Sequence, residues 1–99
     1  MKIEKTTKGF VLITELSTAK EMCLFDRATH EHSEYSTDYS DFKQENKIQC
    51  SYPAYDIIGN SVVASILFWN GCKNFKEEHV IKIQKYIKKN MYTKDNIRE

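Results

Sequence analysis

The most apolar stretch of the sequence is VVASILFW, from Val62 to Trp69. Its β-branched and aromatic residues favour strands. The stretch follows the pair Gly59-Asn60, which is typical of a two-residue turn between antiparallel strands, and the segment DII stands before that turn. The pattern predicts a hairpin whose second strand, over 62–69, is the central strand of a sheet.

The N-terminal part of the sequence predicts a second hairpin followed by a helix. Residues 2–16, KIEKTTKGFVLITEL, place the turn residues TTKG between two β-prone segments. Thr18 with Glu21 three residues later is the pattern of a capping box, which marks a helix N-terminus. Apolar residues at helical spacing follow to about residue 28.

The C-terminal half predicts further strands and then a long helix. Residues 47–58 have the composition of a strand, and Pro53 indicates an edge position or a break in it. Asn74 with Glu77 forms a second capping pattern, so we expect a helix over about 75–91. The apolar face of this helix would consist of Val80, Ile83, Ile87 and Met91.

The order of these elements, roughly ββα(α)βββα, predicts an α+β fold. We expect about four to five antiparallel strands with two or three helices on one face, in a single domain over 1–99. A polar tail from about residue 93 would be frayed. No apolar run approaches the roughly 20 residues of a membrane helix, and the N-terminus lacks the apolar core of a signal peptide. We therefore expect a cytoplasmic protein with no membrane partner.

Five carboxylates recur at helical spacing within 29–46. Their separations are 3, 4, 3 and 4 residues, which places them on one face of a helix. We call this set the acidic row: Glu31, Glu34, Asp38, Asp41 and Glu45. Rings recur beside the row at His32, Tyr35, Tyr39 and Phe42. The segment therefore predicts a helix, although its serines and threonines are weak helix formers.

The acidic row predicts a binding surface for a basic partner. Like charges at this spacing repel by a few tenths of a kcal/mol per pair, and only Lys43 lies nearby to offset them. Duplex DNA presents a phosphate about every 3.4 Å along each strand to grooves lined with Lys and Arg. A row of carboxylates would fit the same grooves, with Tyr35 and Tyr39 as aromatic anchors.

We therefore expect a non-enzymatic inhibitor, without a cofactor, that blocks a basic nucleic-acid-binding groove on a partner protein. We expect a phage or mobile element to encode it and expect it to act in the cytoplasm of the host cell, by analogy with phage-encoded anti-restriction and anti-CRISPR proteins. A bacterial immunity or antitoxin protein is an alternative that shares the acidic interface. In a plainer alternative, Tyr35, Tyr39 and Phe42 face the core and the acids face water.

The C-terminal helix offers a second candidate surface. Residues 73–94 hold seven lysines against two acids, whereas residues 26–46 hold six acids against two cations. A small nucleic-acid-binding regulatory protein would use the lysines of this helix to contact phosphates: Lys82, Lys85, Lys88 and Lys89. Arginine, the usual reader of base edges, is nearly absent. The same lysines could instead neutralise the acidic row within the chain or across a homodimer.

The other reactive side chains form no recognisable motif. His30 and His32 have the spacing of two ligands on an extended backbone, but no third ligand accompanies them at ligand spacing. The cysteines contain no C-x-x-C pair, and we expect them to be reduced and mostly buried: Cys23, Cys50 and Cys72. Trp69 is expected in the core. We predict neither a metal site nor an enzymatic activity.

Overall fold

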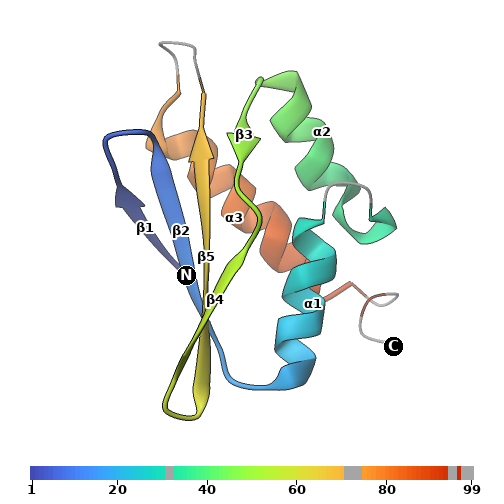
Figure 1. Ribbon diagram of the computed structural model, residues 1–99. Helices are drawn as coiled ribbons and strands as arrows, with labels where there is room; N and C mark the ends of the chain where they lie inside the picture. The colour runs from blue at the N-terminus through green and yellow to red at the C-terminus, as the bar shows by residue number, and fades with distance from the viewer. Residues whose placement is uncertain (31–32, 71–74, 94–95, 97–99) are drawn as a thin grey trace.

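The apolar run does form the central strand of the sheet. In the computed structural model, which describes residues 1–30, 33–70, 75–93 and 96, β5 (Ser61–Trp69) pairs with strands on both of its sides (Figure 1). All pairings are antiparallel. The other strands are β1 (Lys2–Lys5), β2 (Phe10–Leu16), β3 (Gln49–Cys50) and β4 (Ala54–Ile58). The sheet order is β1-β2-β5, with β3 and β4 both along the far side of β5.

The predicted break at Pro53 separates β3 from β4. Cys50 in β3 pairs with Phe68, and pairing with β5 resumes at Ala54. Between them, the backbone N–H of Ser51 donates to the carbonyl oxygen of Leu67 at 2.9 Å, and the Leu67 N–H donates to the Ser51 hydroxyl at 3.0 Å. A side-chain oxygen thus replaces a backbone acceptor where proline, which lacks an N–H, interrupts the edge.

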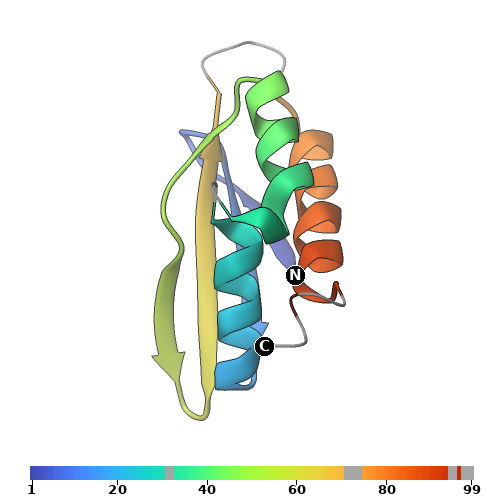
Figure 2. The same ribbon diagram turned by 90° about the vertical axis from the view of Figure 1, so that its right-hand side faces the viewer.

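The helices lie on one face of the sheet, as Figure 2 shows. They are α1 (Ala19–Thr29), α2 (Thr37–Glu45) and α3 (Glu77–Met91), with a short 3-10 helix, η1 (Glu34–Ser36), before α2. The hydroxyl of Thr18 caps α1 by accepting from the Glu21 N–H at 3.0 Å. The predicted α+β fold is therefore confirmed, including the helical interpretation of most of 34–45.

The start of α3 differs from the prediction. The helix begins at Glu77, two residues later than expected, and its N-cap is Lys76. The Lys76 N–H donates to the Nδ1 atom of His79 at 3.0 Å. His79 therefore takes the part that a glutamate plays in a capping box, with its ring as the acceptor. Asn74, the predicted cap, lies outside the described residues.

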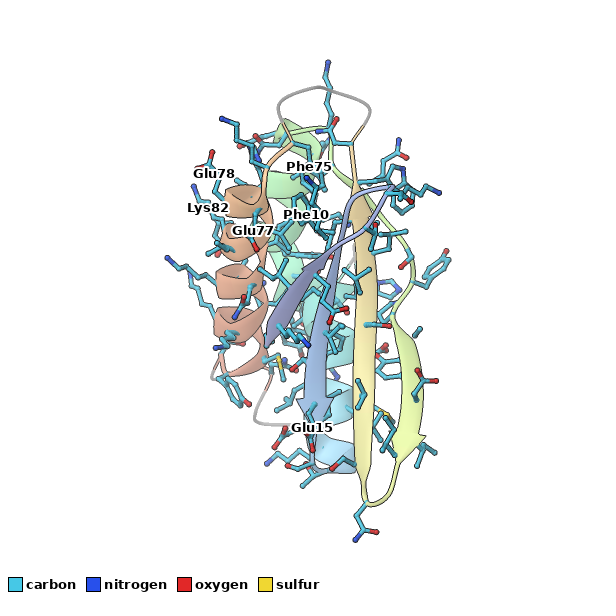
Figure 3. All side chains as sticks on the ribbon, turned by 90° about the vertical axis from the view of Figure 1, so that its left-hand side faces the viewer. Phe10, Glu15, Phe75, Glu77, Glu78 and Lys82 are labelled. Atoms are coloured by element: carbon cyan, nitrogen blue, oxygen red, sulfur yellow. The ribbon has the colours of Figure 1, made fainter. Side chains whose placement is uncertain are left out.

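The core lies between the sheet and the helices. Alternate residues of β2 and β5 point at the helices, as the two-residue period of a strand requires, and they meet the predicted apolar face of α3. The buried residues of this core include Leu12, Leu16, Phe25, Ala64, Ile66, Phe68, Val80, Ile83, Ile87 and Met91. Figure 3 shows Phe10 and Phe75 pointing toward one another at the edge of this core, with ring centroids 5.4 Å apart in an edge-to-face arrangement.

The predicted frayed tail is wrong at Asn96. This side chain is fully buried. Its amide donates to the carbonyl oxygens of Leu24, Asn90 and Met91, at 3.1–3.3 Å, so it links the end of the chain to α1 and α3. A polar side chain is stable in this place because its donors are satisfied.

Candidate protein-binding surface

Two serines of this segment, Ser33 and Ser36, are weak helix formers, but their hydroxyls make local hydrogen bonds to the backbone. The Ser33 hydroxyl accepts from the Tyr35 N–H at 3.2 Å at the start of η1. Ser36 is fully buried, and its hydroxyl donates to the carbonyl oxygens of His30 and Ser33. The serine side chains thus satisfy an N–H of η1 and carbonyl oxygens at the end of α1 and before η1.

The inner face of α2 is built from Tyr39 and Lys43. Tyr39 has no exposed surface, and its ring packs edge-to-face on Phe68 of β5, with centroids 6.3 Å apart. Tyr39 therefore belongs to the core, and its expected place as a partner-binding anchor was wrong. The Tyr39 ring faces inward because burial of an aromatic side chain stabilises the fold.

The described members of the acidic row lie on the outer side of η1 and α2. Glu34, Asp41 and Glu45 are exposed. Within the part of the chain that the structure describes, no lysine, arginine or histidine lies within 4 Å of these three carboxylates. Glu31 falls outside the described residues.

Asp38 differs from the other acids of the row. Its carboxylate accepts from the Lys89 ammonium at 3.0 Å, which joins α2 to α3. Both side chains remain substantially exposed, at 45% for Asp38 and 67% for Lys89. The neutralisation of the row within the chain, which the sequence left open as an alternative, therefore applies to Asp38 among the described members of the row.

The Tyr35 ring remains partly accessible. It is half-buried, and the guanidinium carbon of Arg27 lies 6.0 Å from its ring centroid. A shallow cavity of about 200 Å³ adjoins it, lined by Glu34, Tyr35, Thr37, Asp38, Lys89, Asn90 and Thr93. This volume is below the usual range of small-molecule pockets, about 300–1,000 Å³. The cavity is better suited to a single side chain of a partner than to a metabolite.

The four predicted lysines of α3 do not form one free face. Lys89 pairs with Asp38, and the Lys82 ammonium lies 5.2 Å from the ring centroid of Phe42 on α2. Figure 3 shows Lys82 and Glu78 projecting from the outer side of α3. Lys85 and Lys88 are exposed, and neither has an ion pair or ring contact with Asp38 or Phe42 of α2.

Two exposed apolar residues accompany these lysines: Tyr92, which the sequence already placed near them, and Ile81, which sequence analysis did not select. Ile81 is 42% exposed and Tyr92 is 56% exposed. Ile81, Lys85, Lys88 and Tyr92 follow one another at spacings of 4, 3 and 4 residues, so they share one stripe of the helix surface. The signal was available in the sequence, because Ile81 and Tyr92 fall outside the apolar face that defines the buried side of α3.

The remaining predicted features contribute no metal site among the described residues. His30 is exposed and His79 caps α3, whereas His32 lies outside the described residues. No group of three or more potential ligands occurs in the described part of the chain. Cys23 is exposed and Cys50 is partly exposed, so the expectation of mostly buried thiols is wrong for the described cysteines. Among the described helices, none is long and apolar enough to cross a membrane.

Trp69 is only partly buried. It follows the buried Phe68, so strand alternation places it on the sheet face opposite the helices, and the Lys8 ammonium lies 4.7 Å from the centroid of its ring. The expectation that Trp69 belongs to the core is therefore not met.

Comparison with known proteins gave no match to a family model, to a curated protein or to a solved structure.

Proposed function

We propose that this protein is a non-enzymatic inhibitor whose acidic row binds a basic, nucleic-acid-binding surface of a partner protein. The observation that carries the proposal is the exposure of Glu34, Asp41 and Glu45 on one side of a fixed helical segment, without a cation within 4 Å among the described residues. Uncompensated like charges are mildly unfavourable in the free protein. A cationic partner would relieve that repulsion on binding.

The rigidity of the segment supports this use. The packing of Tyr39, the cap at Ser33 and the Ser36 hydrogen bonds attach η1 and α2 to the core, so the backbone that carries the carboxylates is ordered before a partner arrives. Groups that are ordered in the free protein lose less entropy on binding than groups on a mobile loop. The acids therefore form a pre-arranged row of negative charge.

The shallow cavity beside Tyr35 supplies a place for one cationic side chain of the partner. Glu34 lines it beside Tyr35, whereas Asp38 and Lys89, which also line it, pair with each other. Carboxylates pair with a guanidinium or ammonium group, and an aromatic face attracts the same cation. We propose that a partner lysine or arginine enters this cavity while Asp41 and Glu45 steer the approach.

Affinity capture from a nuclease-treated cell lysate at low salt tests the proposal. The acidic-row variant replaces the three exposed carboxylates by amides: Glu34→Gln, Asp41→Asn and Glu45→Gln. The matched control replaces three exposed carboxylates of the sheet: Glu4→Gln, Glu15→Gln and Asp56→Asn. Figure 3 shows Glu15 on β2, away from α2. Both variants change the net charge by the same amount, so a general charge effect would appear in both.

The proposal expects a nucleic-acid-binding protein to be retained by the parent and the control but lost from the acidic-row variant. Retention should also weaken steeply with salt, because exposed charges are screened. Equal retention by all three proteins would contradict the proposal. Capture of a small toxin through the same acids would instead assign the chain to the immunity or antitoxin class.

The exposed stripe on α3 favours a second candidate function, nucleic-acid binding. Lys85 and Lys88 lie there between the exposed Ile81 and Tyr92. Lysines can contact the phosphate backbone while an exposed aromatic ring stacks on a base. The paired state of Lys89 leaves fewer cations for this surface than the sequence suggested.

Direct titration with single-stranded and duplex DNA tests this second candidate. The variant Lys85→Gln/Lys88→Gln should weaken binding and lower the salt dependence of the affinity by roughly two phosphate contacts. The control Lys5→Gln/Lys20→Gln removes two exposed lysines elsewhere and should leave binding unchanged. Equal effects of both variants would show that the binding is a nonspecific effect of charge, which would contradict this second candidate.

A further inference from the structure

The structure brings a lysine of α2 into the protein interior beside a cysteine of β3. The side chain of Lys43 is almost entirely buried, with the residue only 3% exposed, and its ammonium donates to the Sγ atom of Cys50 at 2.8 Å. The hydroxyl of Tyr39 lies 3.6 Å from the same sulfur. The Tyr39 ring centroid lies 4.5 Å from the Lys43 ammonium.

A turn in the chain between Lys43 and Cys50 brings the two side chains together. Lys47 adopts a left-handed backbone conformation, with φ of 55°, directly after α2 ends. The N–H of Ile48 donates to the carbonyl oxygen of Lys43 at 2.8 Å. This turn directs β3 back along α2, so that Cys50 faces the side chain that precedes it by seven residues.

Burial of an ammonium group is unfavourable unless a partner compensates for the lost hydration. A lysine that served only solubility would lie on the outer side of α2, beside the acidic row. The Cys50 sulfur accepts a hydrogen bond from this ammonium and so offsets part of the lost hydration. Cations beside a thiol generally favour the thiolate, which is the form that attacks disulfides and other electrophiles.

Cys50 also opens onto a cavity. It is partly exposed, and it lines a cavity of about 320 Å³ together with Asp26, Thr29, His30, Ser51, Tyr52 and Pro53. This volume is at the lower end of the range for small-molecule sites. Cys50 thus contacts Lys43 and Tyr39 through its sulfur and also lines a cavity that is large enough for a small reactant.

We propose that Cys50 is a reactive thiol that undergoes thiol–disulfide exchange with small disulfides in this cavity. The Cys50 thiolate attacks one sulfur of the disulfide, a new S–S bond forms, and the original S–S bond breaks. The released half leaves as a thiolate and takes up the proton that Cys50 gave up, so Cys50 is oxidised while the leaving half is reduced. The exchange is independent of the acidic row and of the proposed inhibitor function.

Cys23 provides the reference for the experiment, because it is the more exposed of the two described cysteines. Two single-thiol proteins are compared in the full chain: Cys23→Ser/Cys72→Ser, which keeps Cys50, and Cys50→Ser/Cys72→Ser, which keeps Cys23. Each reacts with the disulfide 5,5′-dithiobis(2-nitrobenzoate), and the released chromophore gives the rate. The proposal expects Cys50 to react roughly tenfold faster than Cys23. If access alone governed the rate, Cys23 would react faster, and that result would overturn the proposal.

The contribution of Lys43 is tested in the protein that keeps Cys50. Lys43→Met preserves much of the side-chain stem and removes the ammonium, so the Cys50 rate should fall at least about tenfold. Tyr39→Phe, which removes only the hydroxyl, should change the rate by less. An unchanged rate in Lys43→Met would overturn the assignment.

A measurement without a substitution at Lys43 covers the case in which that variant does not fold. The protein that keeps Cys50 is compared in its native state and in urea. A thiol activated by its surroundings reacts faster in the native protein, whereas a thiol that is merely shielded reacts faster after unfolding. A rate that rises on unfolding would overturn the proposal, with the protein that keeps Cys23 as the control for effects of urea on the chemistry.

Discussion

Lys89 on α3 donates to Asp38 on α2 at 3.0 Å, and this salt bridge is the point where the basic helix meets the acidic row. Both side chains are well exposed, so the pair is screened by solvent and contributes between about 0 and 1 kcal/mol to the stability of the fold. Its larger consequence is electrostatic, because it removes one carboxylate of the row from the negative surface offered to a partner.

Replacement of Lys89 separates these two effects. We expect Lys89→Met to change the free energy of unfolding by less than about 1 kcal/mol, as measured by urea denaturation. The same variant should bind a basic partner more tightly, because Asp38 then adds its charge to the row. Weaker partner binding in Lys89→Met would indicate that the lysine itself contacts the partner.

Tyr39 and Tyr35 should respond differently to truncation, although the sequence presents them as equivalent. Tyr39→Ala leaves a cavity in the core beside Phe68 and should cost about 3–5 kcal/mol of stability. Tyr35→Ala, at a half-buried position, should cost less stability and should reduce partner binding. Urea denaturation and capture of the two variants, side by side, check this difference. Equal losses of stability would contradict the assignment of Tyr39 to the core and Tyr35 to the surface.

Two glycines provide a matched test of the strand packing. A Cβ at Gly9 would lie 2.0 Å from the carbonyl oxygen of Phe68, so Gly9→Ala forces β5 or the start of β2 to shift. Such overpacking should cost about 3 kcal/mol. At Gly59 nothing lies within 4 Å of the added Cβ, and Gly59→Ala should cost about 1 kcal/mol through its φ of +63° alone. Thermal unfolding of the two variants gives the order, and a larger cost at Gly59 would contradict the tight contact at Gly9.

Tyr55 makes the stability of the fold sensitive to alkaline pH. Burial raises the pKa of its hydroxyl well above the usual value of about 10, and the hydrogen bond that it donates to Asp26 at 2.9 Å raises the pKa further. Above pH 10 the unfolded chain loses this proton while the folded chain keeps it. The stabilisation is therefore complete below about pH 10 and is lost as the pH rises toward the folded-state pKa.

The test is the slope of unfolding free energy against pH between about 9 and 11. Tyr55→Phe has no phenolic proton, so its stability should decline less steeply than that of the parent over this interval. Parallel declines would show that the lysines and the other tyrosines account for the whole effect.

The sequence predicts the fold well where a local pattern of residues is enough to determine an element. The run 62–69, the Gly59-Asn60 turn and the Thr18 cap all appear in the structure as expected, because strand composition, turn chemistry and capping are local properties. The predicted start of α3 was wrong because the helix is capped at Lys76, whose N–H donates to the ring of His79. The sequence pattern had assigned this cap to Asn74 and Glu77.

The candidate sites were harder to predict, because they depend on which side of α2 meets the sheet. The spacing of the acids and rings identified both faces of the helix, yet it could not tell that Tyr39 is fully covered by Phe68 while Tyr35 stays half-buried. The pairing of Lys43 with Cys50 depends on the turn at Lys47 and on strand β3, which is only two residues long. No periodicity in the sequence reports a contact of that kind.

The most direct test of the proposed inhibitor function is a competition experiment with the captured partner. Labelled nucleic acid is bound to that partner at low salt, and its displacement is followed as the parent, the acidic-row variant or the sheet-side control is added. We predict that the parent and the control displace the nucleic acid and that the acidic-row variant does not. Displacement by all three proteins, or a ternary complex of partner, nucleic acid and parent, would contradict the conclusion that the acidic row occupies the nucleic-acid site.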